Sequence, residues 1–143
     1  MNLGLEFEIT WLDETFMQFR VSGSNGIFGG GSHIYGTFEE FKNFASLLKG
    51  FPTTSGDRRE YEAGSFTQEN AEGGLKISFS CTDSIGHIEA RVVVKENGAG
   101  SERKPDFSEF SLKIEPASID RFVESLEQIQ IKIGAKSVLS GAT

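Results

Sequence analysis

The side chains of this chain that are best suited to catalysis or metal binding are a single cysteine and two histidines. A thiolate beside an imidazole is a common enzymatic nucleophile, and Cys81 and His87 are close in sequence. Strand periodicity argues against such a pair, because Cys81 shares the parity of the apolar residues in its strand, whereas His87 has the parity opposite to Ile88. We therefore predict that Cys81 is a buried apolar residue and that the chain has no catalytic residue and is not an enzyme.

A run of glycines at residues 29–31, followed by Ser32 and His33, could cradle a phosphate group. Such a cradle needs a strand, a glycine loop and a helix in succession, and usually a lysine. Strand patterns flank this run on both sides and no lysine accompanies it, so we predict a bulged or bent strand, with His33 at the surface. One cysteine and two histidines without metal-ligand spacing predict no metal site, and no cofactor is expected.

Two pairs of glutamates have the spacing of acid–base catalysts. The members of each pair lie two residues apart on one strand face, roughly 7 Å from each other. Any strand with two outward glutamates has this spacing, so the pattern favours a solvated acidic surface. We propose these four residues as the contact residues for a protein partner: Glu6, Glu8, Glu60 and Glu62.

The first part of the chain is predicted to form strands, which position Glu6, Glu8 and the glycine run. Apolar residues alternate with polar ones from Leu3 to Trp11 and again over residues 15–21, which is typical of half-buried antiparallel strands and places Trp11 on the inward side. Asn25-Gly26 suits the type I′ turn of a hairpin into a third strand over residues 27–35.

The apolar period changes from 2 to 3.6 at Thr37, and a helix is predicted over residues 37–49. Thr37 and Glu40 fit a capping box, and Gly50 is suited to end the helix. A stripe of phenylalanines on this helix favours a core position, and lining a small-molecule pocket is the alternative.

The second part of the chain again shows strand patterns followed by a helix pattern. The patterns predict strands over residues 59–64, 75–81, 88–94 and 110–114, a long hairpin loop over 96–106, and a helix that opens at Pro116. Residues 129–133 alternate, which is consistent with a further short strand, and residues 134–143 are expected to be a frayed tail.

The length of 143 residues indicates one domain, residues 1–143. We predict an α+β fold in the order βββα-ββββ-α: a strongly curved or sandwich-like antiparallel sheet of about six or seven strands, with two amphipathic helices. The net charge of −7 argues against nucleic acid as a partner. No apolar run is long enough for a membrane, and the first ten residues lack a secretion signal, so a cytoplasmic location is expected.

The helix that leads into Lys49-Gly50-Phe51-Pro52, the hairpin over residues 75–94, and residues 110–126 resemble small bacterial domains of unknown function. Some similar domains are treated as immunity proteins of polymorphic toxin systems. The resemblance covers most of residues 5–130 and brings no catalytic residue with it. It implies a binding protein without catalysis, of which an inhibitor of a basic toxin is one form. The alternative is a small-molecule binder or enzyme that uses a cavity between helix and sheet.

Overall fold

The computed structural model describes residues 2–67, 72–96 and 104–143, which form two helices and eight strands. The fold is α+β, as predicted, and the order of elements agrees through the second helix, but the sheets contain eight strands instead of six or seven. The elements are β1 (Gly4–Leu12), β2 (Met17–Ser24), β3 (Gly29–Gly36), α1 (Glu40–Leu48), β4 (Arg58–Gly64), β5 (Gly74–Cys81), β6 (Ile88–Glu96), β7 (Asp106–Ile114), α2 (Pro116–Gln128) and β8 (Lys136–Ser140). The loop predicted over residues 96–106 falls largely outside the described residues.

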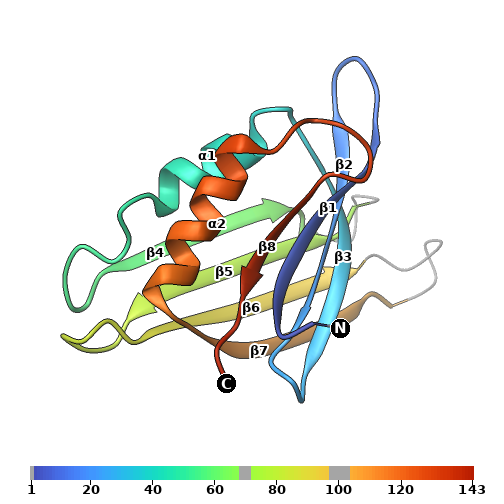
Figure 1. Ribbon diagram of the computed structural model, residues 1–143. Coiled ribbons are helices and arrows are strands. Elements are labelled where there is room, and N and C mark those ends of the chain that lie inside the picture. The colour runs from blue at the N-terminus through green and yellow to red at the C-terminus, as the bar shows by residue number, and fades with distance from the viewer. Residues whose placement is uncertain (1, 68–71, 97–103) are drawn as a thin grey trace.

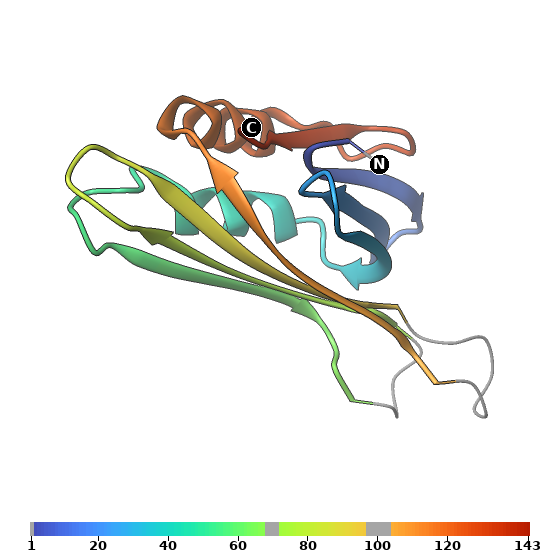
Figure 2. The same cartoon turned by 90° about the horizontal axis from the view of Figure 1, so that it is seen from below.

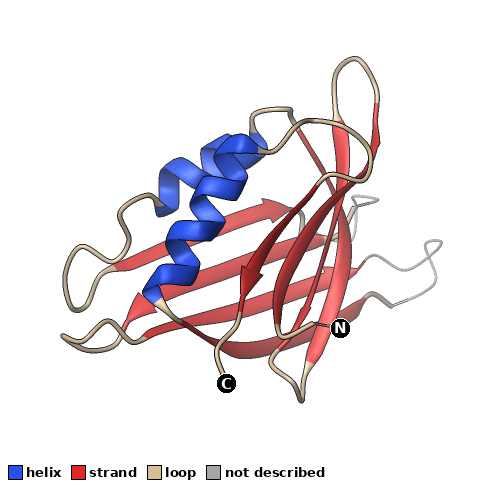
Figure 3. Ribbon diagram, viewed as in Figure 1, coloured by secondary structure: helices blue, strands red, loops and turns tan. Residues whose placement is uncertain are grey.

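Two four-stranded antiparallel sheets form the framework (Figure 1). Sheet A has the order β3-β2-β1-β8, and sheet B has the order β4-β5-β6-β7. Figure 2 shows sheet B as one layer, with sheet A and the helices side by side above it. Within sheet A, β3 packs across all four strands of sheet B. The two helices lie against each other on one side of sheet A (Figure 3), so sheet A has one face toward the helices and one face away from them.

The C-terminal residues are an integral strand, so the prediction of a frayed tail at 134–143 is wrong. Strand β8 pairs antiparallel with β1, and Leu139 is fully buried. The alternating residues 129–133 form a loop instead of a strand. A five-residue strand with small polar residues carries a weak local signal, and its burial depends on β1, which lies more than a hundred residues earlier in the chain.

The first helix begins three residues later than predicted, at Glu40, and has no side-chain capping bond. The expected capping box is absent: Glu39 is the N-cap residue, and the Glu40 carboxylate accepts a hydrogen bond from the Tyr61 hydroxyl, 3.1 Å away on β4. At the other end, Gly50 has a φ of +78°, as expected for a helix terminus. The guanidinium of Arg59 donates to the carbonyls of Leu47 and Lys49 there.

Aromatic rings fill the space between the helices and the sheets, as the phenylalanine stripe predicted. The Phe7 ring of β1 lies 5.8 Å from Phe44 of α1 and 5.7 Å from Phe122 of α2, measured between centroids. Phe44 also stacks on Tyr61 of sheet B at 3.7 Å. All four rings are buried. Each such ring pair stabilises the fold by about 0.5–1.5 kcal/mol beyond the effect of the area that it buries. Because its rings come from β1, α1, α2 and β4, this cluster joins both helices to both sheets.

The glycine run of residues 29–31 lies in a regular strand, and the predicted bulge is absent: β3 pairs with β2 without a register shift. The reason for the glycines is the close approach of β3 to sheet B. A Cβ atom on Gly30 would lie 2.8 Å from Ser108 Cβ and 3.1 Å from Val94 Cγ1. The Ser108 hydroxyl donates to the Gly29 carbonyl, and the Ser32 hydroxyl donates to a carbonyl of β6.

The turn between β2 and β3 differs from the predicted type I′ turn. Residues 25–28 form a four-residue loop, closed by a bond from the Asn25 N–H to the Phe28 carbonyl. Gly26 has a positive φ, but Asn25 does not, so the turn is not type I′. Ile27 and Phe28 therefore lie outside the strand and are exposed.

We expect Gly30→Ala to lower the free energy of unfolding by about 1–3 kcal/mol, because the added methyl group overpacks the contact between β3 and β7. Urea denaturation measures the loss. The control is the same substitution in a Ser108→Gly background, where the nearest obstructing atom is absent. The cost of Gly30→Ala should be smaller there, and an equal cost in both backgrounds would contradict the packing explanation.

Candidate functional site

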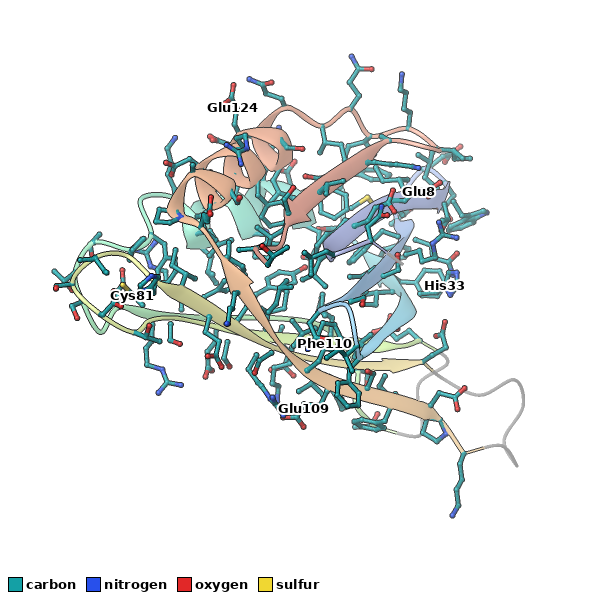
Figure 4. The ribbon with its side chains drawn as sticks, turned by 60° about the horizontal axis from the view of Figure 1, so that its bottom comes forward. Glu8, His33, Cys81, Glu109, Phe110 and Glu124 are labelled. Carbon is teal, nitrogen blue, oxygen red and sulfur yellow. The ribbon has the colours of Figure 1, made fainter. Side chains whose placement is uncertain are left out.

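The face of sheet A opposite the helices is covered by no other described helix or strand. We call its outward residues the open face: Glu6, Glu8 and Trp11 of β1; Gln18, Arg20 and Ser22 of β2; His33 and Tyr35 of β3; and Lys136 and Val138 of β8. Figure 4 shows Glu8 and His33 on this side, pointing away from the helices. Because four strands support it, this surface has a fixed backbone.

Ion pairs link neighbouring strands across the open face. Arg20 Nη2 lies 2.8 Å from Glu8 Oε1, and Lys136 Nζ lies 3.1 Å from Glu6 Oε1. Exposed pairs of this kind contribute about 0–1 kcal/mol each to stability. Their larger effect is on the electrostatic potential of the surface, since Glu6 and Glu8 each have a cation beside them. The open face is therefore polar without being strongly acidic.

Two large aromatic rings lie at one end of the open face. The register of β1 against β2 shifts between Ile9 and Trp11, and this irregularity turns Trp11 outward, opposite Gln18. Trp11 is 44% exposed and Tyr35 is 45% exposed, and their rings meet edge-on with centroids 6.4 Å apart. The prediction that Trp11 points inward is wrong. Thr10 is an extra residue in β1 relative to β2, so the side chains after it change faces, and the sequence pattern does not reveal this change.

The four glutamates proposed as one contact surface lie on two different sheets. Glu60 and Glu62 project from β4 on the outer side of sheet B, where their neighbours on β5 are Ser78 and Lys76. The Ser78 hydroxyl lies 3.5 Å from Glu60 Oε1, and Lys76 Nζ lies 4.0 Å from Glu62 Oε2. Sheet A brings Glu6 and Glu8 together, but the structure does not bring the two glutamate pairs together.

Cys81 is buried, and its thiol donates to the Asp83 carbonyl at 3.2 Å. His87 is exposed, and its Nδ1 is hydrogen-bonded to the Asp83 carboxylate. The hydrogen bond from His87 holds the pKa of Asp83 below its usual value. The thiol and the imidazole therefore bond to different groups of Asp83, its carbonyl and its carboxylate, and not to each other. The prediction that Cys81 belongs to the core is confirmed.

The remaining histidine, His33, lies at the surface on the open face, as predicted. Its Nδ1 lies 2.6 Å from Glu96 Oε2 at the end of β6. Among residues 2–67, 72–96 and 104–143, no group of three or more His, Cys, Asp or Glu side chains could hold a metal ion. Neither described helix has the length and apolar character needed to cross a membrane.

Three of the clefts that the described residues form lie at the surface. One of about 400 Å³ lies between α2 and Lys136. Another of about 490 Å³ lies at the ends of β6 and β7, beside residues 142–143, and a third of about 120 Å³ lies between β3 and β7. No buried phenylalanine lines any of the three. The alternative expectation was an apolar helix–sheet pocket lined by the phenylalanine stripe of α1, and these three clefts do not touch that stripe.

One carboxylate is partly buried beside the aromatic core. Burial raises the pKa of Glu40 above its usual 4.5, and the hydrogen bond from Tyr61 only partly offsets this effect. Burial also raises the pKa of the Tyr61 hydroxyl well above its usual value. Both shifts follow from taking a charged form out of water. This pair joins α1 to sheet B and lies on the side of the molecule away from the open face.

Comparisons with protein-family models, with curated proteins and with solved structures found no match to this chain.

Cys81 should resist thiol reagents in the native protein, because its sulfur is buried and its proton is bound to the Asp83 carbonyl. Ellman's reagent should label one thiol per chain after denaturation in guanidinium and none before it. A Ser22→Cys variant, with an added thiol on the open face, is the positive control and should react at once. Rapid modification of Cys81 in the folded wild-type chain would contradict its core position.

Glu40→Gln should change how stability depends on pH. Because folding raises the pKa of Glu40, its favourable contribution is present below pH 4.5 and is lost as the pH rises through the raised value. Glutamine cannot ionise and can still accept the Tyr61 bond. The free energy of unfolding of the variant, relative to wild type, should therefore increase from pH 4 to pH 7 in urea titrations. A difference that stays constant would contradict the assignment.

Proposed function

We propose that this chain is a non-enzymatic protein-binding module that recognises a basic protein through the open face of sheet A. An immunity-type inhibitor that neutralises a basic toxin in the cytoplasm is the form of this function that we favour. The observation that carries the proposal is the half-exposed Trp11–Tyr35 pair, with Arg20 in the next row of the same face. Tryptophan, tyrosine and arginine are the residues most enriched among those that dominate binding energy in protein interfaces.

The shape of the open face supports a protein partner over a small molecule. Small ligands bind in concave pockets that enclose most of their surface. Neither Trp11 nor Tyr35 lines any of the three clefts described above. A broad strand-supported surface that combines two half-exposed aromatic rings with polar neighbours has the residue types of a protein interface.

The charge of the whole chain, rather than that of the open face alone, supports a basic partner. The chain has a net charge of −7, and complementary charge raises the rate of association of two proteins. Glu6 and Glu8 lie within the open face, where a cationic side chain of the partner can compete with Lys136 and Arg20 for them. In this proposal, Glu6 and Glu8 are contact residues, whereas Glu60 and Glu62 on sheet B lie outside the interface.

The proposal is tested by capture of the partner and measurement of its affinity. The tagged chain is used to capture proteins from the source cells and from cells that co-express the neighbouring genes. Each captured protein is then identified by mass spectrometry, purified and titrated by calorimetry. Trp11→Ala and Tyr35→Ala should each weaken binding by about tenfold or more, since such residues typically contribute about 2 kcal/mol. Phe107→Ala, at an exposed aromatic residue of sheet B, should leave the affinity unchanged.

Tryptophan fluorescence gives an independent measurement. Trp11 is the only tryptophan of the chain, so its emission reports directly on the open face. Binding should shift that emission to shorter wavelength, because the indole leaves water. Three outcomes would contradict the proposal: no captured partner, a partner of net negative charge, or an affinity that Trp11→Ala does not change.

A further inference from the structure

The turn between β2 and β3 contains the dipeptide Asn25-Gly26, in which the chain can react with itself. The backbone nitrogen that follows an asparagine can attack the carbonyl carbon of the asparagine side chain, because the two atoms close a five-membered ring. Glycine hinders this attack least, since it has no Cβ. Gly26 is exposed, and no atom beyond its chain neighbours lies within 4 Å of the place where its Cβ would be. Water therefore has access to this part of the turn.

Two backbone N–H groups bind the oxygen of the Asn25 side chain. Ile27 N lies 3.0 Å from Asn25 Oδ1, and Phe28 N lies 2.9 Å from the same oxygen. Attack at the side-chain carbonyl carbon places negative charge on this oxygen. Preorganised N–H donors stabilise such a charge, as they do in the oxyanion hole of an acyl-transfer enzyme. The native turn therefore orders the side chain and also favours the attack.

The nitrogen of the Asn25 side chain has its partner on the other sheet. Asn25 Nδ2 donates to the Ser111 carbonyl of β7 at 3.0 Å. Strand β7 is an edge strand of sheet B, so this bond connects the β2–β3 turn of sheet A to the edge of sheet B. The Ser108 hydroxyl on the same strand bonds to the Gly29 carbonyl just after the turn. The group that leaves in the reaction is thus a group that joins the two sheets.

We propose that Asn25 is a modification site, at which the chain converts asparagine to aspartate and isoaspartate without an enzyme, and that this conversion breaks the bond between the β2–β3 turn and β7. The co-reactant is water, and the second product is ammonia. The inference does not rest on the proposed function. Residue 25 follows the last residue of β2, whereas the Trp11–Tyr35 pair lies opposite Gln18, near the first residue of that strand.

The reaction balances without an oxidant or a reductant. Hydroxide removes the proton of the Gly26 N–H, which is bonded to Ser24 Oγ at 2.8 Å, and the nitrogen forms a bond to Asn25 Cγ. The bond from Cγ to Nδ2 breaks, and Nδ2 leaves as ammonia after it takes a proton from water. Water then opens the cyclic imide at either of its two carbonyl carbons. One opening gives aspartate, and the other gives isoaspartate, in which the chain continues through the side-chain carbon.

Both products replace the side-chain amide by a carboxylate, which only accepts hydrogen bonds when it is ionised. In the aspartate product, one carboxylate oxygen can still accept from Ile27 and Phe28, so the turn keeps its local bonds. The other oxygen faces the Ser111 carbonyl, and two negatively polarised oxygens repel each other. Aspartate at position 25 therefore weakens the contact between the turn and β7 while the turn itself remains.

The reaction is tested by mass spectrometry after the folded chain has been incubated in H₂¹⁸O at mildly alkaline pH. Trypsin in ordinary water then releases residues 21–42 as one peptide, because it cleaves after Arg20 and Lys42. Asn25 is the only asparagine in that peptide, which has no glutamine, so a labelled carboxylate identifies the residue that reacted. We expect two labelled products, and a rate that rises with pH because the attacking nitrogen must lose its proton.

Two controls accompany this measurement. The chain unfolded in urea gives the rate without the native turn, and the folded chain should react at least as fast, because its two N–H donors are already in place. Asn25→Gln keeps the amide but requires a six-membered ring, so this variant should give no labelled product in the same time.

The loss of the bond to β7 is tested with a variant that has the structure of one product. Asn25→Asp should raise the equilibrium constant of unfolding about tenfold, because the Ser111 carbonyl loses its donor and faces a negative charge. Asn43→Asp makes the same change of charge at an exposed position of α1 and should alter the constant by no more than about twofold. Urea denaturation measures both constants.

Slower labelling of residue 25 in the folded chain than in the unfolded chain, or no labelling, would overturn the assignment of the site, since the fold would then protect Asn25. Equal effects of Asn25→Asp and Asn43→Asp on unfolding would overturn the role of the bond to β7. Neither result bears on the effect of Trp11→Ala on a captured partner, so this inference and the proposed function can fail separately.

Discussion

The arrangement of the whole molecule depends on the contact that lays β3 across sheet B. At Gly30 the two sheets approach so closely that even one methyl group would meet Ser108 and Val94. Hydroxyl groups of Ser32 and Ser108 bond across the same contact to backbone carbonyls. Because β3 is an edge strand of sheet A, this contact fixes sheet A to sheet B at one edge. The opposite edge strand, β8, contacts sheet B less, although directly after it the Ala142 N–H donates to the Lys113 carbonyl of β7. One face of sheet A remains uncovered.

The same contact explains why the aromatic rings between the helices and the sheets can pack against both sheets. With sheet A held over sheet B, the two helices fill the remaining space beside it (Figure 2). Phe44 of α1 then contacts Phe7 of sheet A and Tyr61 of sheet B together. Burial of these rings stabilises the fold, and the molecule has no need to cover the open face in order to complete its core.

The open face and the cleft beside α2 are parts of one continuous surface. Lys136 belongs to both, since it pairs with Glu6 on the open face and lines the cleft. A partner bound to the open face near β8 would therefore lie beside this cleft.

Alternation and helical periodicity in the sequence determined most of the secondary structure by themselves. They correctly predicted the hairpin of β5 and β6, the buried stripe of α1, the start of α2 at Pro116 and the inward position of Cys81. These features depend on near neighbours in the chain, because a period of 2 or 3.6 assigns a side chain to one face without any knowledge of the partner element.

Tertiary structure alone decided the features on which the candidate site depends. The irregularity at Thr10 that turns Trp11 outward, the pairing of β8 with β1, and the division of the four glutamates between two sheets leave no local pattern. Each depends on contacts between segments that are distant in the chain. The sequence states which residues share a strand face, but the packing of one sheet on another determines which of those faces meets water.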